Sequence, residues 1–162
     1  MRVLLLLQIV ALCMSCGPSA AEIKTAKTAH YRGNASEMFN EVIAVTQETY
    51  KIANANGGDE DSYVLATVPQ WYTAEGGRES AGDQGYTQIR DHSVRLELIV
   101  ELVSVAGGFM VTVTPKTFQA LSGSPQPREL KPDDPNLPGW VPGRVDSLQL
   151  EIHKRLQNYA VQ

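Results

Sequence analysis

The sequence predicts an α+β fold, in which two helices cover one face of a mainly antiparallel sheet of four to five strands. Residues 93–103 alternate between apolar and polar side chains, and a second β-rich segment follows them after a glycine pair, as in an antiparallel hairpin. Two other segments, one towards each end of the chain, place apolar residues at helical spacing. With 162 residues and 43% hydrophobic content, the chain is long enough for one domain with a substantial core.

The first elements expected are a strand near 25–31 and a helix after it. Gly33 interrupts the chain, and Asn34 with Glu37 three residues later has the spacing of a helix capping box. Apolar positions then recur every three or four residues until about Thr49. The residues expected to face the core are Phe39, Val42, Ile43 and Thr46, flanked by Met38 and Val45.

Four further strands are predicted. One begins at 50–52, and the residues NANGGDEDS after it are typical of a turn. The segment 63–72 is rich in β-formers, but Pro69 indicates a sheet edge, a bulge or the end of a strand inside it. The hairpin follows, with a tight reversal at 106–108 and a partner strand that runs until Pro115. Its buried face is expected to carry Val94, Leu96, Leu98, Val100 and Leu102.

A proline-rich loop over 121–142 and a second helix from about Gly143 complete the chain. Such a long loop is usually functional or lies over the surface of the domain. The helix is predicted by the spacing of Val145, Leu148, Ile152 and Leu156. The expected order is therefore β-α-β-β-β-β-α, within a single domain at 25–162.

The first 15 residues have the pattern of an export signal. Arg2 supplies the positive charge, an apolar run extends to Leu12, and small residues follow. The run is far shorter than the roughly 20 apolar residues that a membrane-spanning helix needs, so we expect an export signal and not a transmembrane anchor.

The end of this signal resembles a bacterial lipobox. In the stretch Cys13-Met14-Ser15-Cys16-Gly17, a small residue immediately precedes the cysteine, although Cys13 stands where Leu is usual. We therefore expect cleavage before Cys16, lipid attachment to Cys16, and a short lipidated tether over 16–24. The alternative is ordinary cleavage after Ala21, which would release a soluble periplasmic or secreted protein.

The resemblance to lipoproteins accounts for both cysteines of the chain. It implies a thioether-linked diacylglyceride on Cys16 and an acylated amino group, which together exceed what stable membrane anchoring requires. Cys13 leaves with the signal. Because no cysteine then remains in the folded body, a disulfide, a thiol nucleophile and a cysteine-based metal site are excluded.

Charge and motifs exclude several other functions. The chain has 14 Lys+Arg against 18 Asp+Glu without runs of like charge, which argues against nucleic acid and against an electrostatic hold on anionic lipid. The acidic runs at 59–61 and 133–134 lack EF-hand spacing, so no metal or cofactor is expected.

The pair Asp91-His92 has two interpretations: an oriented general base, or a turn aspartate beside a solvated histidine. The turn is favoured because no candidate nucleophile lies nearby in the sequence, and we expect no enzyme activity.

Trp71 and Trp140 are the candidate partner-binding residues. Trp71 ends a predicted strand, and Trp140 precedes the last helix. The two indoles would form an exposed aromatic patch for a partner or a glycan. Alternatively, Trp140 pins the proline-rich loop onto the core and Trp71 caps the sheet edge. The second interpretation is favoured because indoles are mostly well buried.

The whole pattern is similar to small bacterial envelope lipoproteins. The signal, the lipobox, the helix opened by Asn-Ala-Ser-Glu, the YKI…G…YVLATVPQWY segment and the hairpin resemble the helix-grip domains of barrel-assembly accessory and lipopolysaccharide-assembly lipoproteins. The resemblance covers about residues 25 to 160 in element order. It implies a non-catalytic scaffolding or assembly role with an envelope protein partner.

Gly17 after the cysteine also resembles lipoproteins sent to the outer membrane, facing the periplasm. The alternative function is a periplasmic binding module for a small amphiphile or cell-wall fragment, held between helices and sheet. Such a module needs a cavity of a few hundred Å³ in its core.

Overall fold

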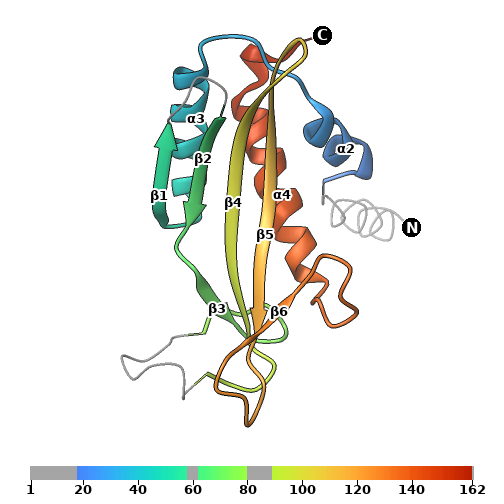
Figure 1. Ribbon diagram of the computed structural model, residues 1–162. Helices are drawn as coiled ribbons and strands as arrows, with labels where there is room; N and C mark the ends of the chain where they lie inside the picture. The colour runs from blue at the N-terminus through green and yellow to red at the C-terminus, as the bar shows by residue number, and fades with distance from the viewer. Residues whose placement is uncertain (1–17, 58–61, 80–88, 162) are drawn as a thin grey trace, which may run out of the picture.

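The chain folds as an antiparallel sheet packed with helices (Figure 1), in a computed structural model that describes residues 18–57, 62–79 and 89–161. The predicted α+β class is confirmed. The elements in chain order are α2 (Ala20–Thr28), α3 (Ala35–Gln47), β1 (Ile52–Gly57), β2 (Ser62–Thr67), β3 (Gln70–Tyr72), β4 (Val94–Val105), β5 (Gly108–Gln119), β6 (Arg128–Leu130), α4 (Trp140–Arg155) and the 3₁₀ helix η2 (Gln157–Tyr159). The export signal, Cys16 and the acidic run at 59–61 lie outside the described residues.

The sheet is built around the β4–β5 hairpin. The strand order is β1-β2-β4-β5-β6, and β3 pairs with β4 beyond the end of β2. Pro69 therefore marks the end of a strand, one of the predicted outcomes. At this break the Thr67 hydroxyl accepts a hydrogen bond from the Leu98 N–H at 2.9 Å, which satisfies a β4 group between its two partner strands.

The predicted hairpin is confirmed, but its second strand is longer than expected. Pro115 does not end β5, because it pairs with Leu98, whose N–H points to Thr67 on the other side of β4. The Leu98–Pro115 pair therefore exchanges no ladder hydrogen bonds, and the missing N–H of Pro115 is not needed there.

The two helices that cover the sheet were both predicted. The Asn34 side chain accepts the Glu37 N–H at 3.2 Å and caps α3. Helix α4 begins at Trp140, earlier than the expected Gly143, because Pro142 falls in the first turn, where backbone N–H groups have no acceptor within the helix. Figure 1 shows α3 and α4 behind the sheet.

The core lies between these helices and the sheet, and none of its members is more than 8% exposed. Its side chains are Tyr31, Met38, Phe39, Val42, Val45, Leu65, Tyr72, Leu96, Leu98, Val100, Leu102, Val111, Val113, Val141, Val145, Leu148, Ile152 and Leu156.

The strand predicted near 25–31 is wrong. Ala20–Thr28 forms α2 because Ser19 and Glu22 make a complete capping box and the sequence after them favours a helix. Helix α2 thus begins inside the segment for which a tether was expected. Only Tyr31 joins the sheet, through bridges to Phe109 and Ala160.

The turn expected after 50–52 is also wrong in part. Asn54–Gly57 continue β1, because their backbone groups pair with β2 in spite of their low strand propensity. Residues 58–61 of that expected turn lie outside the described part of the chain.

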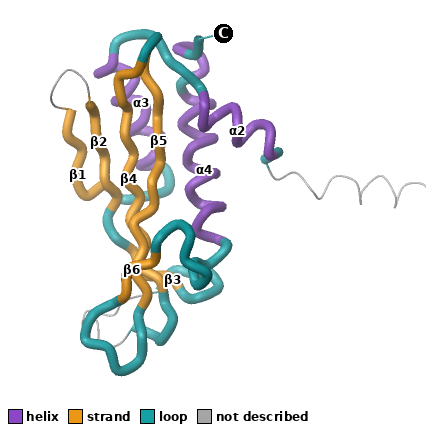
Figure 2. The backbone as a smooth tube through the Cα atoms, turned by 45° about the vertical axis from the view of Figure 1, so that its right-hand side comes forward, coloured by secondary structure: helices purple, strands orange, loops and turns teal. Residues whose placement is uncertain are grey.

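A buried amide on α4 connects helix α2 to the sheet. The Gln149 Nε2 donates to the Ala26 carbonyl at 3.2 Å and to the Val111 carbonyl at 3.0 Å, and its Oε1 accepts the Val113 N–H at 3.1 Å. Gln149 therefore satisfies β5 where β6 does not pair with it, and it fixes α2 to the same place. Figure 2 shows α2 beyond α4, on the side away from β1 and β2.

Candidate functional site

The two tryptophans lie on opposite faces of the sheet. Trp71 and Tyr72 are neighbours in β3, so their side chains point to opposite faces. Tyr72 is 1% exposed and packs on the core side against Trp140, with ring centroids 5.1 Å apart. The structure thus places Trp71 apart from Trp140, and the two do not form a shared aromatic patch.

Trp140 holds the turn that follows β3. Its Nε1 donates to the Ala74 carbonyl at 2.9 Å, and the turn passes over the indole at Gly76. Gly76 has φ +89°, and a Cβ there would lie 2.9 Å from Trp140 Cγ, so only glycine fits without strain. Trp140 thus anchors the start of α4, and with it the end of the proline-rich loop, to the turn at 73–77.

Arg144, one turn further along α4, completes this anchor. Its guanidinium carbon lies 4.4 Å from the centroid of the Tyr72 ring and 5.3 Å from that of Trp140, and its Nη2 donates to the Gly76 carbonyl at 2.9 Å. Burial raises the pKa of Tyr50, and the nearby Arg144 partly offsets this rise. Arg144 is therefore occupied by contacts within the fold.

A second arginine stacks between aromatic rings on the open face of the sheet. The register places Trp71, Arg95 and Phe118 side by side on β3, β4 and β5. The Arg95 guanidinium carbon lies 4.6 Å from the Phe118 ring centroid and 5.8 Å from that of Trp71. All three side chains are half-buried, and we call them the Arg95 cluster.

The charge of the Arg95 cluster is not neutralised within the described residues. No hydrogen bond or ion pair between described residues involves the Arg95 guanidinium, whereas Trp71 takes part in a further interaction besides its contact with Arg95. The neighbouring Glu97 and Lys116 form their own ion pair at 3.9 Å. A guanidinium presents five N–H donors in one plane, and stacking leaves the donors at its edge available. This geometry suits a carboxylate that binds two of the donors at once.

The rest of the open face is partly apolar. No helix of the described chain covers it, and its half-buried apolar side chains continue along the sheet beyond the Arg95 cluster. They are Val64, Ile99, Val103 and Met110. Exposed polar residues such as Thr112 and Thr114 alternate with them across the strands.

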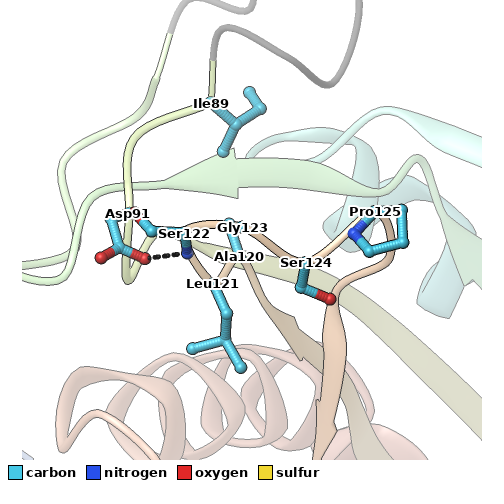
Figure 3. A pocket seen from close by; sticks show the side chains of 8 residues that line it. All are labelled: Ile89, Asp91, Ala120, Leu121, Ser122, Gly123, Ser124 and Pro125. Atoms are coloured by element: carbon cyan, nitrogen blue, oxygen red, sulfur yellow. Dashed lines mark hydrogen bonds between the residues drawn. The ribbon is translucent and has the colours of Figure 1, made fainter.

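Several hollows lie at the surface of the described part of the chain, among them one of about 440 Å³ at the end of α3, lined by residues 47–51 with Val68, Gln70, Tyr72 and Arg78. Another of about 450 Å³ is lined by loop residues around Asp91 and 120–125 (Figure 3). The Asp91 carboxylate accepts the Ser122 N–H at 2.7 Å and the His92 N–H at 3.1 Å. The hydrogen bonds from Ser122 hold the pKa of Asp91 below its usual range. This arrangement fits the turn interpretation of Asp91-His92.

Two further hollows adjoin each other where α2 meets α4. Their volumes are about 510 and 260 Å³, and both are lined by Thr25 and His153. The Tyr31 hydroxyl and His153 Nδ1 are 2.8 Å apart. Burial raises the pKa of Tyr31 to about 12 and lowers the pKa of His153. Both groups are therefore neutral near pH 7, and the pair holds the chain segment after α2 against α4.

Sequence reasoning missed Arg95, Phe118 and Arg144. The alternation of β4 placed Arg95 on the polar face, and Phe118 lay beyond the expected end of the second hairpin strand. The signal for the Arg95 cluster is the register of β3 on β4, which joins residues far apart in the chain.

Within the described residues, no group of His, Cys, Asp or Glu side chains could hold a metal ion, and no helix is long and apolar enough to cross a membrane. Compared with known proteins, the chain matches no family model, no curated protein and no solved structure.

Proposed function

We propose that this protein is a non-catalytic lipoprotein of the bacterial cell envelope that docks a partner protein through the open face of its sheet. The observation behind this proposal is the Arg95 cluster, in which a stacked guanidinium has no acceptor among the described residues. The protein then acts as a scaffold or assembly factor in the outer membrane, facing the periplasm.

In this proposal, the protein is attached to the membrane by lipid on Cys16. Ser15-Cys16 stands at the end of an apolar run too short to span a bilayer, as in lipoproteins. Two or more acyl chains hold a protein stably at a membrane, whereas a single chain holds it only marginally. A protein held in this way meets its partners by diffusion along the membrane surface.

The composition of the Arg95 cluster favours a protein partner. Trp and Arg are enriched among the residues that dominate binding energy at protein interfaces, and aromatic anchors in half-buried positions lose little entropy on binding. The flanking apolar side chains of the open face extend the contact area. We therefore expect the partner to place an acidic side chain against Arg95 and apolar side chains beside it.

The packed core favours this function over a binding module that holds its ligand between helices and sheet. The residues there are nearly all fully buried against each other, and the hollow of about 440 Å³ at the end of α3 reaches this core at Tyr72 alone and opens at the surface. A ligand of the alternative kind would have to bind at the surface instead.

The test is capture of envelope proteins by the intact lipidated chain after crosslinking, with Arg95→Glu compared with Lys51→Glu. Both substitutions make the same change of charge, and Lys51 is exposed beside β1. We expect Arg95→Glu to lose the captured partner and Lys51→Glu to keep it, with similar melting temperatures. Equal capture by the two variants would contradict the proposal.

A further inference from the structure

We infer that the end of the domain where α2 meets α4 lies directly against the lipid headgroup layer. This surface consists of the first turns of α2 with Lys154 and Gln157, and we call it the α2–α4 end. The inference rests on the proposed lipid anchor and adds to it a fixed orientation of the domain on the membrane.

The spacer between the anchor and the fold is short. Only Gly17 and Pro18 separate Cys16 from Ser19, which caps α2. Three steps of about 3.8 Å between Cα atoms span at most about 11 Å. The headgroup region of one leaflet is itself roughly 5–8 Å thick, so Ser19 is held at its outer boundary.

Because helix α2 is packed firmly on the domain, the position of Ser19 at the membrane also fixes the position of the rest of the domain. Ala26 in this helix is 1% exposed, and its carbonyl accepts the buried Gln149 amide of α4. Lys27 forms an ion pair with Asp146, also on α4. At the other end, the Ser19 N–H and hydroxyl both donate to Glu22 at 2.7 Å. The helix is therefore part of the folded body and not a loose extension of the tether.

The chemistry of the α2–α4 end suits phospholipid headgroups. Its exposed residues are small or polar, and its charged residues are Glu22, Lys24 and Lys154, of which Lys154 forms an ion pair with the neighbouring Glu151 at 3.1 Å. Such a surface is neither repelled by nor strongly attracted to a phospholipid layer. The lipid on Cys16 supplies the binding energy, and the short spacer supplies the orientation.

The orientation decides which parts of the domain a periplasmic partner meets. Figure 2 shows β1 and β2 at the edge of the sheet opposite to α2. With the α2–α4 end on the membrane, this edge of the sheet faces away from the bilayer.

The experiment measures proximity to lipid with a fluorophore on one introduced cysteine. Gln157→Cys labels the α2–α4 end, and Asn54→Cys on β1 is the matched control, because both residues are exposed. Each new thiol is the only reactive one in the lipidated protein, since Cys16 is blocked. The lipidated variants are placed in vesicles of phosphatidylethanolamine and phosphatidylglycerol that contain a nitroxide-headgroup lipid.

We expect quenching several-fold stronger at position 157 than at position 54. Insertion of about 12 Gly/Ser residues after Gly17 adds a flexible span of roughly 20 Å and should remove most of this difference. Equal quenching at the two positions, or a difference that survives the insertion, would overturn the inference while the anchor stands. Mass spectrometry of the same sample reports the anchor separately, because a chain without lipid would overturn both proposals.

Discussion

Two arginines stack on aromatic rings on opposite faces of the same short strand, and they differ in what else they bind. Arg144 lies against Tyr72 and Trp140 and donates to the Gly76 carbonyl. Arg95 lies between Trp71 and Phe118, and no described residue accepts its hydrogen bonds.

The comparison shows that a cation–π contact alone does not define the role of an arginine. A stacked guanidinium whose donors are occupied by backbone carbonyls fixes a loop in place. A stacked guanidinium without an acceptor among the described residues is oriented for an acceptor from outside them. Three of the following predictions compare the closed face of the sheet with the open one, and another tests the turn on the closed face.

The largest expected difference between the two faces is at the centre of β4. Leu98 is fully buried, so Leu98→Asp places an unpaired carboxylate in the core and costs several kcal/mol, comparable with the ~5–15 kcal/mol that stabilises a small domain. The adjacent Glu97→Ala on the open face should change stability by less than about 1 kcal/mol. Thermal unfolding checks both, and similar melting of the two variants would contradict the assignment of faces.

The two tryptophans should also differ. Trp140→Ala removes the packing on Tyr72, the hydrogen bond to Ala74 and the indole surface on which Gly76 lies. The substitution should lower the free energy of unfolding by about 2–3 kcal/mol. Trp71→Ala removes a half-buried ring from the open face and should cost about 1 kcal/mol. Denaturant unfolding measures both values. A larger loss of stability for Trp71→Ala than for Trp140→Ala would mean that the open face contributes more to the stability of the fold than the Trp140 contacts do.

Glycine substitutions test the turn held by Trp140. Gly76→Ala should cost about 1–2 kcal/mol, because φ is +89° and the new Cβ would press on the indole. Gly77→Ala is the control, since a Cβ there meets only ordinary contacts with Thr73 and should change stability by a few tenths of a kcal/mol. Faster proteolysis within 73–77 in the first variant alone is the expected readout. Identical cleavage of both would argue against the anchor.

The smallest expected difference is between the arginines themselves. Arg144→Lys should cost about 1 kcal/mol, because a lysine cannot lie flat on two rings and also reach the Gly76 carbonyl. Arg95→Lys should cost less than about 0.5 kcal/mol in stability but weaken partner capture. If Arg95→Lys destabilised the fold as much as Arg144→Lys, Arg95 would be a structural residue.

The sequence by itself determined the elements whose signals are local. The alternation along β4, the cap at Asn34 and the apolar spacing of α4 each depend on residues within one element, so the hairpin and both covering helices were predicted from them. Pro69 indicated a sheet edge, a bulge or the end of a strand, and the last of these is the outcome, whereas the end of a strand predicted from Pro115 is wrong because β5 continues through it.

The tertiary structure decided what depends on distant partners. Pro115 is tolerated because Thr67 takes the Leu98 N–H, Asn54–Gly57 become a strand because β2 pairs with them, and α2 is held by Gln149 from the far end of the chain. The Arg95 cluster likewise forms from three strands whose register no short stretch encodes. Local sequence patterns determine the conformation of the backbone within one element. The long-range contacts that give a side chain its role form only when the strands and helices pack against each other.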